Sequence, residues 1–78
     1  MREVRSVITG DRRVSLWCDE QYWYSVRLEV WAEGCWQDIS RQSDASLGIT
    51  AAHRRYAECV MMAQLRSADT APSIHSLE

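Results

Sequence analysis

The stretch YWYSVRLEVWAEGCW, residues 22–36, decides the fold that we expect of this 78-residue chain. It contains three of the four tryptophans, and along residues 22–32 apolar and polar side chains alternate. This period is typical of a β-strand with one buried face. The pair Glu33 and Gly34 then fits a two-residue hairpin turn, because glycine adopts positive φ without steric cost. The stretch therefore predicts a strand, a tight turn and a further strand over residues 35–41.

The segments on either side complete the expected fold. Residues 3–9 are rich in β-branched side chains and end at a Gly-Asp turn, and residues 13–18 alternate, so both predict strands. Over residues 46–67 the apolar period becomes helical, and Asp44 or Ser46 can cap the first turn. The apolar stripe of this helix comprises Ile49, Ala52, Tyr56, Cys59, Val60 and Ala63. We therefore expect an α+β fold, a four-stranded antiparallel β-meander with one long C-terminal helix packed on one face.

The chain is short enough to form one domain, which we place at residues 1–67. Residues 68–78 are small and polar, contain Pro72 and show no period, so we expect a flexible tail. The N-terminal residues lack the apolar run of a signal peptide, and no segment reaches the roughly 20 apolar residues of a membrane span. Three cysteines without a CxxC spacing fit free thiols in a reducing compartment. We therefore expect a cytoplasmic protein.

Composition restricts the partners of the chain. Nine basic and eleven acidic residues give a net charge of -2, which supplies no general attraction to nucleic acid or to an anionic membrane. Every basic residue is arginine, and lysine, asparagine and phenylalanine are absent. The codons of these three residues are rich in A and T. We infer that the gene comes from a G+C-rich bacterial or phage genome.

The hairpins determine where the tryptophans point. The turn at Glu33 and Gly34 places Trp31 opposite Trp36, and a loop over residues 19–21 places Trp17 opposite Trp23. By parity, all four tryptophans then lie on one face of the sheet. We expect the helix to cover the other face, because that face is the more apolar. Its residues are Val14, Leu16, Cys18, Tyr22, Tyr24, Val26, Leu28 and Val30.

The tryptophan face is the candidate functional surface. A monomer rarely leaves so much aromatic area in water, and tryptophan and arginine are enriched in binding hot spots. The residues expected to contact a partner are Trp17, Trp23, Arg27, Glu29, Trp31, Trp36 and Asp38. A second contact surface is expected on the helix, at Arg54, Arg55, Met62 and Arg66.

We interpret the chain as a non-enzymatic protein-interaction module. One form is a homodimer, in which Arg27 approaches Glu29 and Asp38 of the other chain. The other is an adaptor or inhibitor that binds a larger host protein. The size and layout of the chain are also similar to those of small proteins of phages and mobile elements, anti-CRISPR inhibitors among them.

Two alternatives remain for this surface. In the first, the tail or a misplaced strand covers it, or a one-residue register slip turns Trp36 inward. In the second, the tryptophans stack on the bases of single-stranded nucleic acid while Arg13 and Arg27 bind phosphates. Glu29 and Asp38 would repel a phosphate backbone, so protein contact is preferred.

The chain carries no convincing metal, cofactor or catalytic site. Cys18, Cys35 and Cys59 are residues that zinc prefers. However, the expected register puts Cys18 and Cys35 roughly 33 Å apart, so we interpret the cysteines as small buried hydrophobes. Glu29 and Asp38 would be cross-strand neighbours, as in an acid and base pair, but on an exposed face they are more often solvated charges. We therefore expect no cofactor, no metal and no enzymatic activity.

Overall fold

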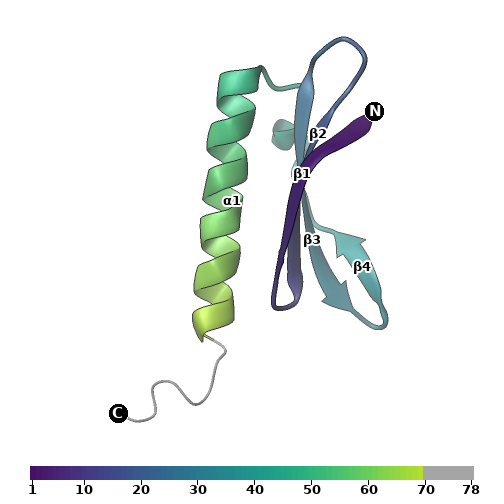
Figure 1. Cartoon of the computed structure of the whole chain (residues 1–78). Helices are drawn as coiled ribbons and strands as arrows, with labels where there is room; N and C mark the ends of the chain where they lie inside the picture. Colours follow the sequence, from purple (N-terminus) through teal and green to yellow (C-terminus); the bar gives the residue numbers. More distant parts are fainter. Residues whose placement is uncertain (70–78) are drawn as a thin grey trace.

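The computed structural model describes the backbone of residues 1–69 and the side chains of residues 1–66 (Figure 1). Four antiparallel strands form one sheet in the order β1-β2-β3-β4, and a long helix follows. The expected α+β meander with a C-terminal helix is therefore confirmed. The elements are β1 (Arg2–Thr9), β2 (Arg12–Cys18), β3 (Tyr24–Ala32), β4 (Cys35–Asp38), the 3-10 helix η1 (Gln42–Asp44) and α1 (Ile49–Asp69).

Two tight turns connect the outer strand pairs. Gly10 has φ 60° in the turn between β1 and β2. In the turn between β3 and β4, Glu33 has φ 54° and Gly34 has φ 85°, the pair of positive values that a type I′ hairpin requires. This turn sets Trp31 directly opposite Trp36, as the sequence predicts.

The connection between β2 and β3 is longer than expected. Cys18 pairs with Tyr24 and Trp17 pairs with Ser25, so the expected pairing of Trp17 with Trp23 is wrong. The reason is Asp19, whose carboxylate accepts hydrogen bonds from the backbone N–H groups of Gln21 and Trp23, both at 2.9 Å. These bonds close a loop over residues 19–23 and delay the start of β3 by two residues.

The segment after β4 covers the part of the β3 edge that β4 leaves open. β4 ends at Asp38 and not at residue 41, because the Asp38 carboxylate accepts the N–H of Ser40 at 2.8 Å and turns the chain. The Ser40 hydroxyl then accepts the N–H of Leu28 at 2.8 Å. Further along, Leu47 and Tyr24 exchange backbone hydrogen bonds of 2.7 and 2.8 Å. The β3 edge beyond β4 is thereby paired with the chain itself.

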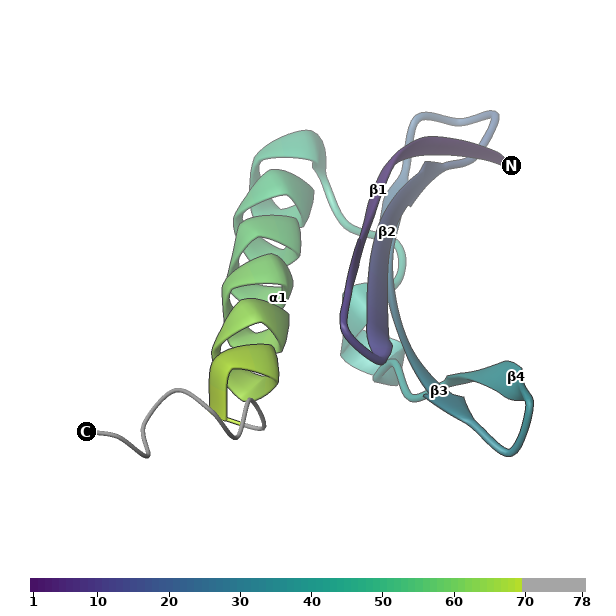
Figure 2. The same cartoon turned by 60° about the horizontal axis from the view of Figure 1, so that its bottom comes forward.

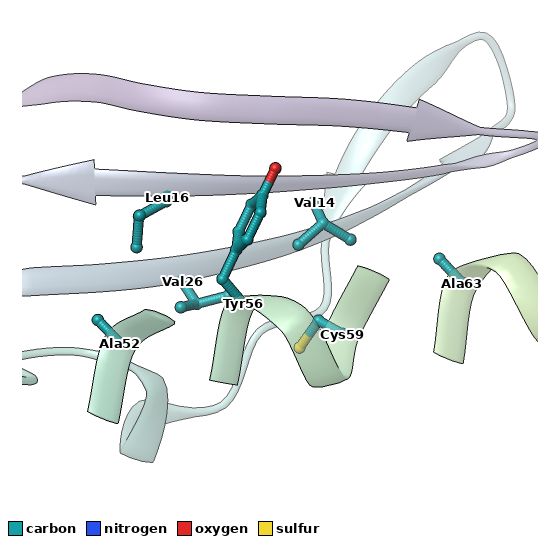
Figure 3. Packing of buried hydrophobic residues seen from close by; sticks show 7 residues of the cluster. All are labelled: Val14, Leu16, Val26, Ala52, Tyr56, Cys59 and Ala63. Carbon is teal, nitrogen blue, oxygen red and sulfur yellow. The ribbon is translucent and has the colours of Figure 1, made fainter. Parts of the chain in front are cut away.

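Helix α1 lies on one face of the sheet, mainly over β2 and β3 (Figure 1). The core forms where its apolar stripe meets the even-numbered side chains of these strands (Figure 3). The buried members of this cluster are Val14, Leu16, Val26, Ala52, Tyr56, Cys59 and Ala63. The predicted facing of the sheet is therefore confirmed at these positions.

Several side chains lie outside the expected core. Tyr22 belongs to the loop before β3 and is exposed, Ile49 is exposed at the first residue of α1, and Cys35 is exposed beside the β3–β4 turn. The predictions that these three side chains are buried are wrong. Each of these residues lies in a loop or at the end of an element, where no opposing layer reaches it.

The start of α1 is fixed by an ion pair. Asp44 is only 5% exposed. Its carboxylate accepts a hydrogen bond from the Nε of Arg55 at 2.8 Å and another from the backbone N–H of Arg41 at 3.2 Å. Asp44 therefore ties η1 to the helix, and does not cap the helix as expected. At the other end, α1 continues to Asp69, two residues beyond the predicted end at residue 67. The remaining tail residues, 70–78, lie outside the described part of the chain.

Candidate functional site

The outer sheet face is the face opposite α1. Ser25, Arg27, Glu29 and Trp31 alternate with the helix-facing residues of β3 and therefore lie on it. Figure 2 shows α1 on one side of the sheet only, and no helix or strand within residues 1–69 covers the other side. The pairing of Trp17 with Ser25 and of Trp36 with Trp31 places these two tryptophans on the outer sheet face as well.

One cluster on this face combines Arg13, Glu29, Trp36 and Trp31. The Nε of Arg13 donates to a carboxylate oxygen of Glu29 at 2.8 Å, and the guanidinium lies 4.7 Å from the ring centre of Trp36. Trp31 meets Trp36 edge to face, with ring centres 5.4 Å apart. Glu29 is buried, and its hydrogen bond raises the pKa of Arg13 above the ordinary value. Trp36 is therefore held from two sides, whereas 49% of Trp31 remains exposed.

A second cluster repeats this arrangement with Arg27, Trp17 and Asp38. The guanidinium of Arg27 lies 4.6 Å from the ring centre of Trp17, and its Nε lies 3.9 Å from an Asp38 oxygen. The indole N–H of Trp17 donates to the hydroxyl of the buried Ser15 at 2.9 Å. Hydrogen bonding from Ser40, through its side chain and its backbone N–H, lowers the pKa of Asp38, and the charge of Arg27 acts in the same direction.

Each arginine of the outer sheet face is thus placed between a tryptophan and a carboxylate. The two units are Arg13 with Trp36 and Glu29, and Arg27 with Trp17 and Asp38; we call them the Trp–Arg–carboxylate units. Stacking on an arginine fixes the plane of an indole without covering its outer surface. The face is therefore an ordered aromatic surface whose charges are largely paired within the chain.

Trp23 is the tryptophan that the expected arrangement misplaces. It lies in the loop between β2 and β3, next to Tyr22, whose φ is 65°. Its N–H binds the Asp19 carboxylate, and its carbonyl accepts the N–H of Asp19 at 2.9 Å. The backbone of Trp23 is thus anchored while 49% of the residue is exposed. Trp23 therefore places an exposed aromatic side chain at the end of the sheet, and it does not pair with Trp17.

A depression of about 340 Å³ borders the outer sheet face near the second unit. Its lining includes Trp17, Arg27 and Asp38, together with Arg41 and Gln42 from the segment after β4. It lies where β4 has ended and η1 begins.

The four residues expected to form a second surface on α1 differ in their availability. Arg54, Met62 and Arg66 are exposed. Arg55 is 24% exposed in its side chain and is engaged by Asp44 and, at 3.5 Å, by Glu58. These interactions raise the pKa of Arg55, with the hydrogen bond to Asp44 as the largest cause. Arg55 therefore has a structural role that its position in the sequence did not reveal.

Arg13 is the residue of the outer sheet face that sequence reasoning undervalued. The sequence predicts for Arg13 only a phosphate-binding role in the nucleic-acid alternative, whereas in the structure it joins Glu29 and Trp36 across three strands. The contact with Glu29 would follow from the sequence if the β2–β3 register were known, because that register puts Arg13 directly opposite Glu29. That register depends on the Asp19 loop, which the sequence pattern alone did not locate.

Residues 1–69 were also compared with the requirements of a metal site, a reactive thiol and a membrane-spanning helix. No group of three or more histidine, cysteine or acidic side chains there is close enough to hold a metal ion. Cys18 and Cys59 are buried, and burial raises the pKa of the Cys59 thiol. In the same residues, no helix has the length and apolar character needed to cross a membrane.

Comparison of the chain with models of protein families, with curated proteins and with solved structures gave no match. Any assignment of function therefore has to come from the geometry of the chain itself.

Proposed function

We propose that this protein is a non-enzymatic interaction module whose outer sheet face binds another protein. The observation that carries the proposal is the pair of Trp–Arg–carboxylate units on a sheet face that no described element covers. They orient Trp17 and Trp36, and Trp36 in turn supports the half-exposed Trp31. The contact residues of the proposal are Trp17, Trp23, Arg27, Glu29, Trp31, Trp36 and Asp38, joined by Arg13.

The energetics of binding favour such a surface. A buried aromatic side chain removes on the order of 200 Å² from water, and Trp31 still exposes about half of its area. Immobilising a free side chain on binding costs roughly 0.5–1.5 kcal/mol. Stacking within the chain already restricts the motion of these tryptophans, so less of this cost remains when a partner binds. Tryptophan and arginine held in this way are the residues that dominate hot spots.

The charges of the face favour a foreign protein over a copy of the same chain on this surface. A homodimer through the outer sheet face was expected to exchange Arg27 with Glu29 and Asp38 between chains. Glu29 is instead buried against Arg13, and Asp38 lies near Arg27 of its own chain. We therefore propose an adaptor or an inhibitor of a larger protein. A bacterial or phage origin and a cytoplasmic location are part of this proposal.

Binding of single-stranded nucleic acid is the less supported alternative. Arg13 and Arg27 would have to leave their carboxylates to bind phosphates, and Glu29 and Asp38 would then face the phosphate backbone. Base stacking on Trp31 would remain possible. The alternative predicts quenching of tryptophan fluorescence by a single-stranded oligonucleotide, with a steep dependence on salt.

The test compares Trp31→Ala with a matched control, Ile49→Ala. Both side chains are large, apolar and about half exposed, but Ile49 lies at the start of α1, away from the outer sheet face. Proteins retained from a bacterial lysate by the immobilised wild-type chain should be lost with Trp31→Ala and kept with Ile49→Ala. Both variants should unfold within about 1 kcal/mol of the wild type, because neither residue belongs to the core.

A retained protein that binds Trp31→Ala as tightly as the wild type would contradict the proposal. Salt-sensitive quenching by an oligonucleotide, with no retained protein, would favour the nucleic-acid alternative.

A further inference from the structure

The free edge of β1 is a second surface that the proposed function does not use. Within residues 1–69, β1 is at the end of the sheet order and pairs with β2 on one side only. An open edge strand of this kind presents backbone groups that can pair with another strand. The opposite edge differs, because β4 is short and the chain after it pairs with β3.

The tight turn determines which backbone groups of β1 face outward. Thr9 and Arg12 flank the two-residue turn and therefore form a hydrogen-bonded pair. Antiparallel pairs alternate, so Val7 also bonds to β2, while the N–H and C=O groups of Ser6 and Ile8 point to the free edge. The register shifts between Glu3 and Arg5, which interrupts the strand at Val4. The regular part of the open edge is thus residues 5–9.

A groove runs beside this edge, between β1 and α1. It has a volume of about 400 Å³ and is lined by Arg5, Tyr56, Val60 and Met61 among others. The guanidinium of Arg5 lies 5.0 Å from the ring centre of Tyr56. Met61 on the helix side is 61% exposed, and Ile8, which pairs with Arg13 and therefore lies on the outer sheet face, is 59% exposed. One exposed apolar side chain therefore lies near the open edge on each face of the sheet, Met61 on the helix side and Ile8 on the outer side.

We propose that a second copy of this chain pairs its β1 with this edge, antiparallel, about a two-fold axis at Val7. In this register Ser6 forms hydrogen-bonded pairs with Ile8 of the partner subunit, and the reverse pair follows by symmetry. Val7 meets the partner's Val7 on the helix side. Arg5 stands opposite the partner's Thr9, so no like charges meet.

Neighbouring registers are less favourable, which makes this one specific. A two-fold axis at Arg5 would set two arginines side by side, a destabilising cross-strand pair. An axis at Ser6 would bring the irregular residue Val4 into the ladder opposite the partner's Ile8. Only the axis at Val7 pairs all five of the regular residues 5–9 with one another.

We choose a copy of the chain as the occupant because residues 5–9 can pair with the same residues of a second copy in one register, without like charges opposite each other and without the irregular residue Val4. A stable dimer usually buries about 800 Å² on each chain. Five paired residues and the side chains beside the groove make a smaller contact, so we expect a dimer that dissociates on dilution. Its sheet would have eight strands, with the outer sheet faces of both chains on the same side.

Sedimentation velocity tests the proposal across about two orders of magnitude in concentration. The expected result is a monomer–dimer equilibrium. Hydrogen exchange should slow at the amides of Ser6 and Ile8 as the concentration rises, whereas the Val7 amide, bonded to β2, should not respond. A monomer at every concentration would overturn the proposal, as would a dimer whose Ser6 and Ile8 amides exchange as in the monomer.

Two substitutions at Thr9 test the register. Thr9→Glu places a carboxylate opposite the partner's Arg5 and should tighten the dimer, whereas Thr9→Arg places like charges there and should weaken it. Cross-strand charge pairs contribute about 0.2–1 kcal/mol each, and the dimer contains two, so each change should be about two- to thirty-fold in the dissociation constant. Equal dissociation constants for the two variants would overturn the register.

Ser6→Pro is a further variant. It removes an N–H that points away from β2, so the fold should persist while the dimer is lost. A folded Ser6→Pro variant that still forms the dimer would overturn the proposal. If this variant fails to fold, the two Thr9 variants decide the outcome.

Discussion

Replacing Asp44 with alanine removes the carboxylate that ties the loop after β4 to helix α1. Asp44 is buried and accepts two hydrogen bonds, one from the Arg55 Nε at 2.8 Å and one from the Arg41 N–H at 3.2 Å. Without it, Arg55 loses its shortest ionic contact and an N–H before η1 loses its acceptor. We expect the substitution to lower the free energy of unfolding while the fold persists.

The size of the loss follows from the burial of the two partners. Removing one member of a buried ion pair typically costs about 3–5 kcal/mol. Arg55 is 24% exposed and keeps Glu58 at 3.5 Å, so water and a second carboxylate offset part of that cost. We therefore expect about 2 kcal/mol, which in a domain of this size lowers the melting temperature by roughly 10 °C. Asp44→Asn should cost about half as much, because its amide oxygen still accepts a hydrogen bond.

Urea unfolding followed by tryptophan fluorescence measures these losses. A double-mutant cycle of Asp44→Ala with Arg55→Ala should give a coupling of about 1–2 kcal/mol between the two side chains. Glu58→Ala is the matched control, since its carboxylate is largely exposed, and it should stay within about 0.5 kcal/mol of the wild type. A loss below about 0.5 kcal/mol for Asp44→Ala, or a coupling near zero, would refute the reasoning. Arg55 would then be free to act in the second contact surface.

Three further predictions concern other side chains. The pKa of Asp38 is lowered in the folded state, so its stabilising contribution is present above the unfolded value of 3.8 and disappears as the pH falls through the folded pKa. In the Asp38→Asn variant, the free energy of unfolding should therefore fall less steeply than in the wild type as the pH is lowered through the acid range. The same pH dependence in both proteins would contradict this. A thiol reagent should label the exposed Cys35 first, while the buried Cys59, whose pKa is raised above 9.0, should react only when denaturant is added. Equal labelling rates would contradict this assignment. Leu16 is fully buried, so Leu16→Ala should cost about 3 kcal/mol in urea unfolding, and a cost below about 1 kcal/mol would mean that the core rearranges.

The facing of the sheet was predictable because it depends on parity and on one turn. Glu33 and Gly34 form the predicted two-residue turn, in which both residues adopt positive φ, and this turn sets Trp31 opposite Trp36. The β2–β3 register was wrong by two residues at Trp23, since Asp19 closes a longer loop. A shift of two residues preserves parity, so the division of β3 into two faces survived this error.

The arginine stacking was not predictable from pairing alone. Arg13 and Trp36 are on strands that do not pair, and their contact depends on the twist of the sheet and on side-chain rotamers. The burial of Glu29 follows from the same geometry, because a carboxylate on a sheet face is buried only when neighbours close over it. The sequence pattern therefore predicts the outer sheet face but not the burial of Glu29 or the pairing of its charge with Arg13.

The two proposed surfaces lead to a joint prediction about a foreign partner. A dimer joined at β1 places two outer sheet faces on one side of an eight-stranded sheet, so a partner with repeated sites could engage both. Linking two sites raises the apparent affinity through the effective concentration of the second site, by about 10²–10⁴-fold where the spacing fits. Ser6→Pro should remove only this gain and leave each single contact intact, whereas Trp31→Ala should remove the contact and leave the dimer. Surface plasmon resonance at low and high partner density separates the two effects. If both variants lose binding equally at low density, the outer sheet face and the β1 edge do not act independently, and the partner contacts both.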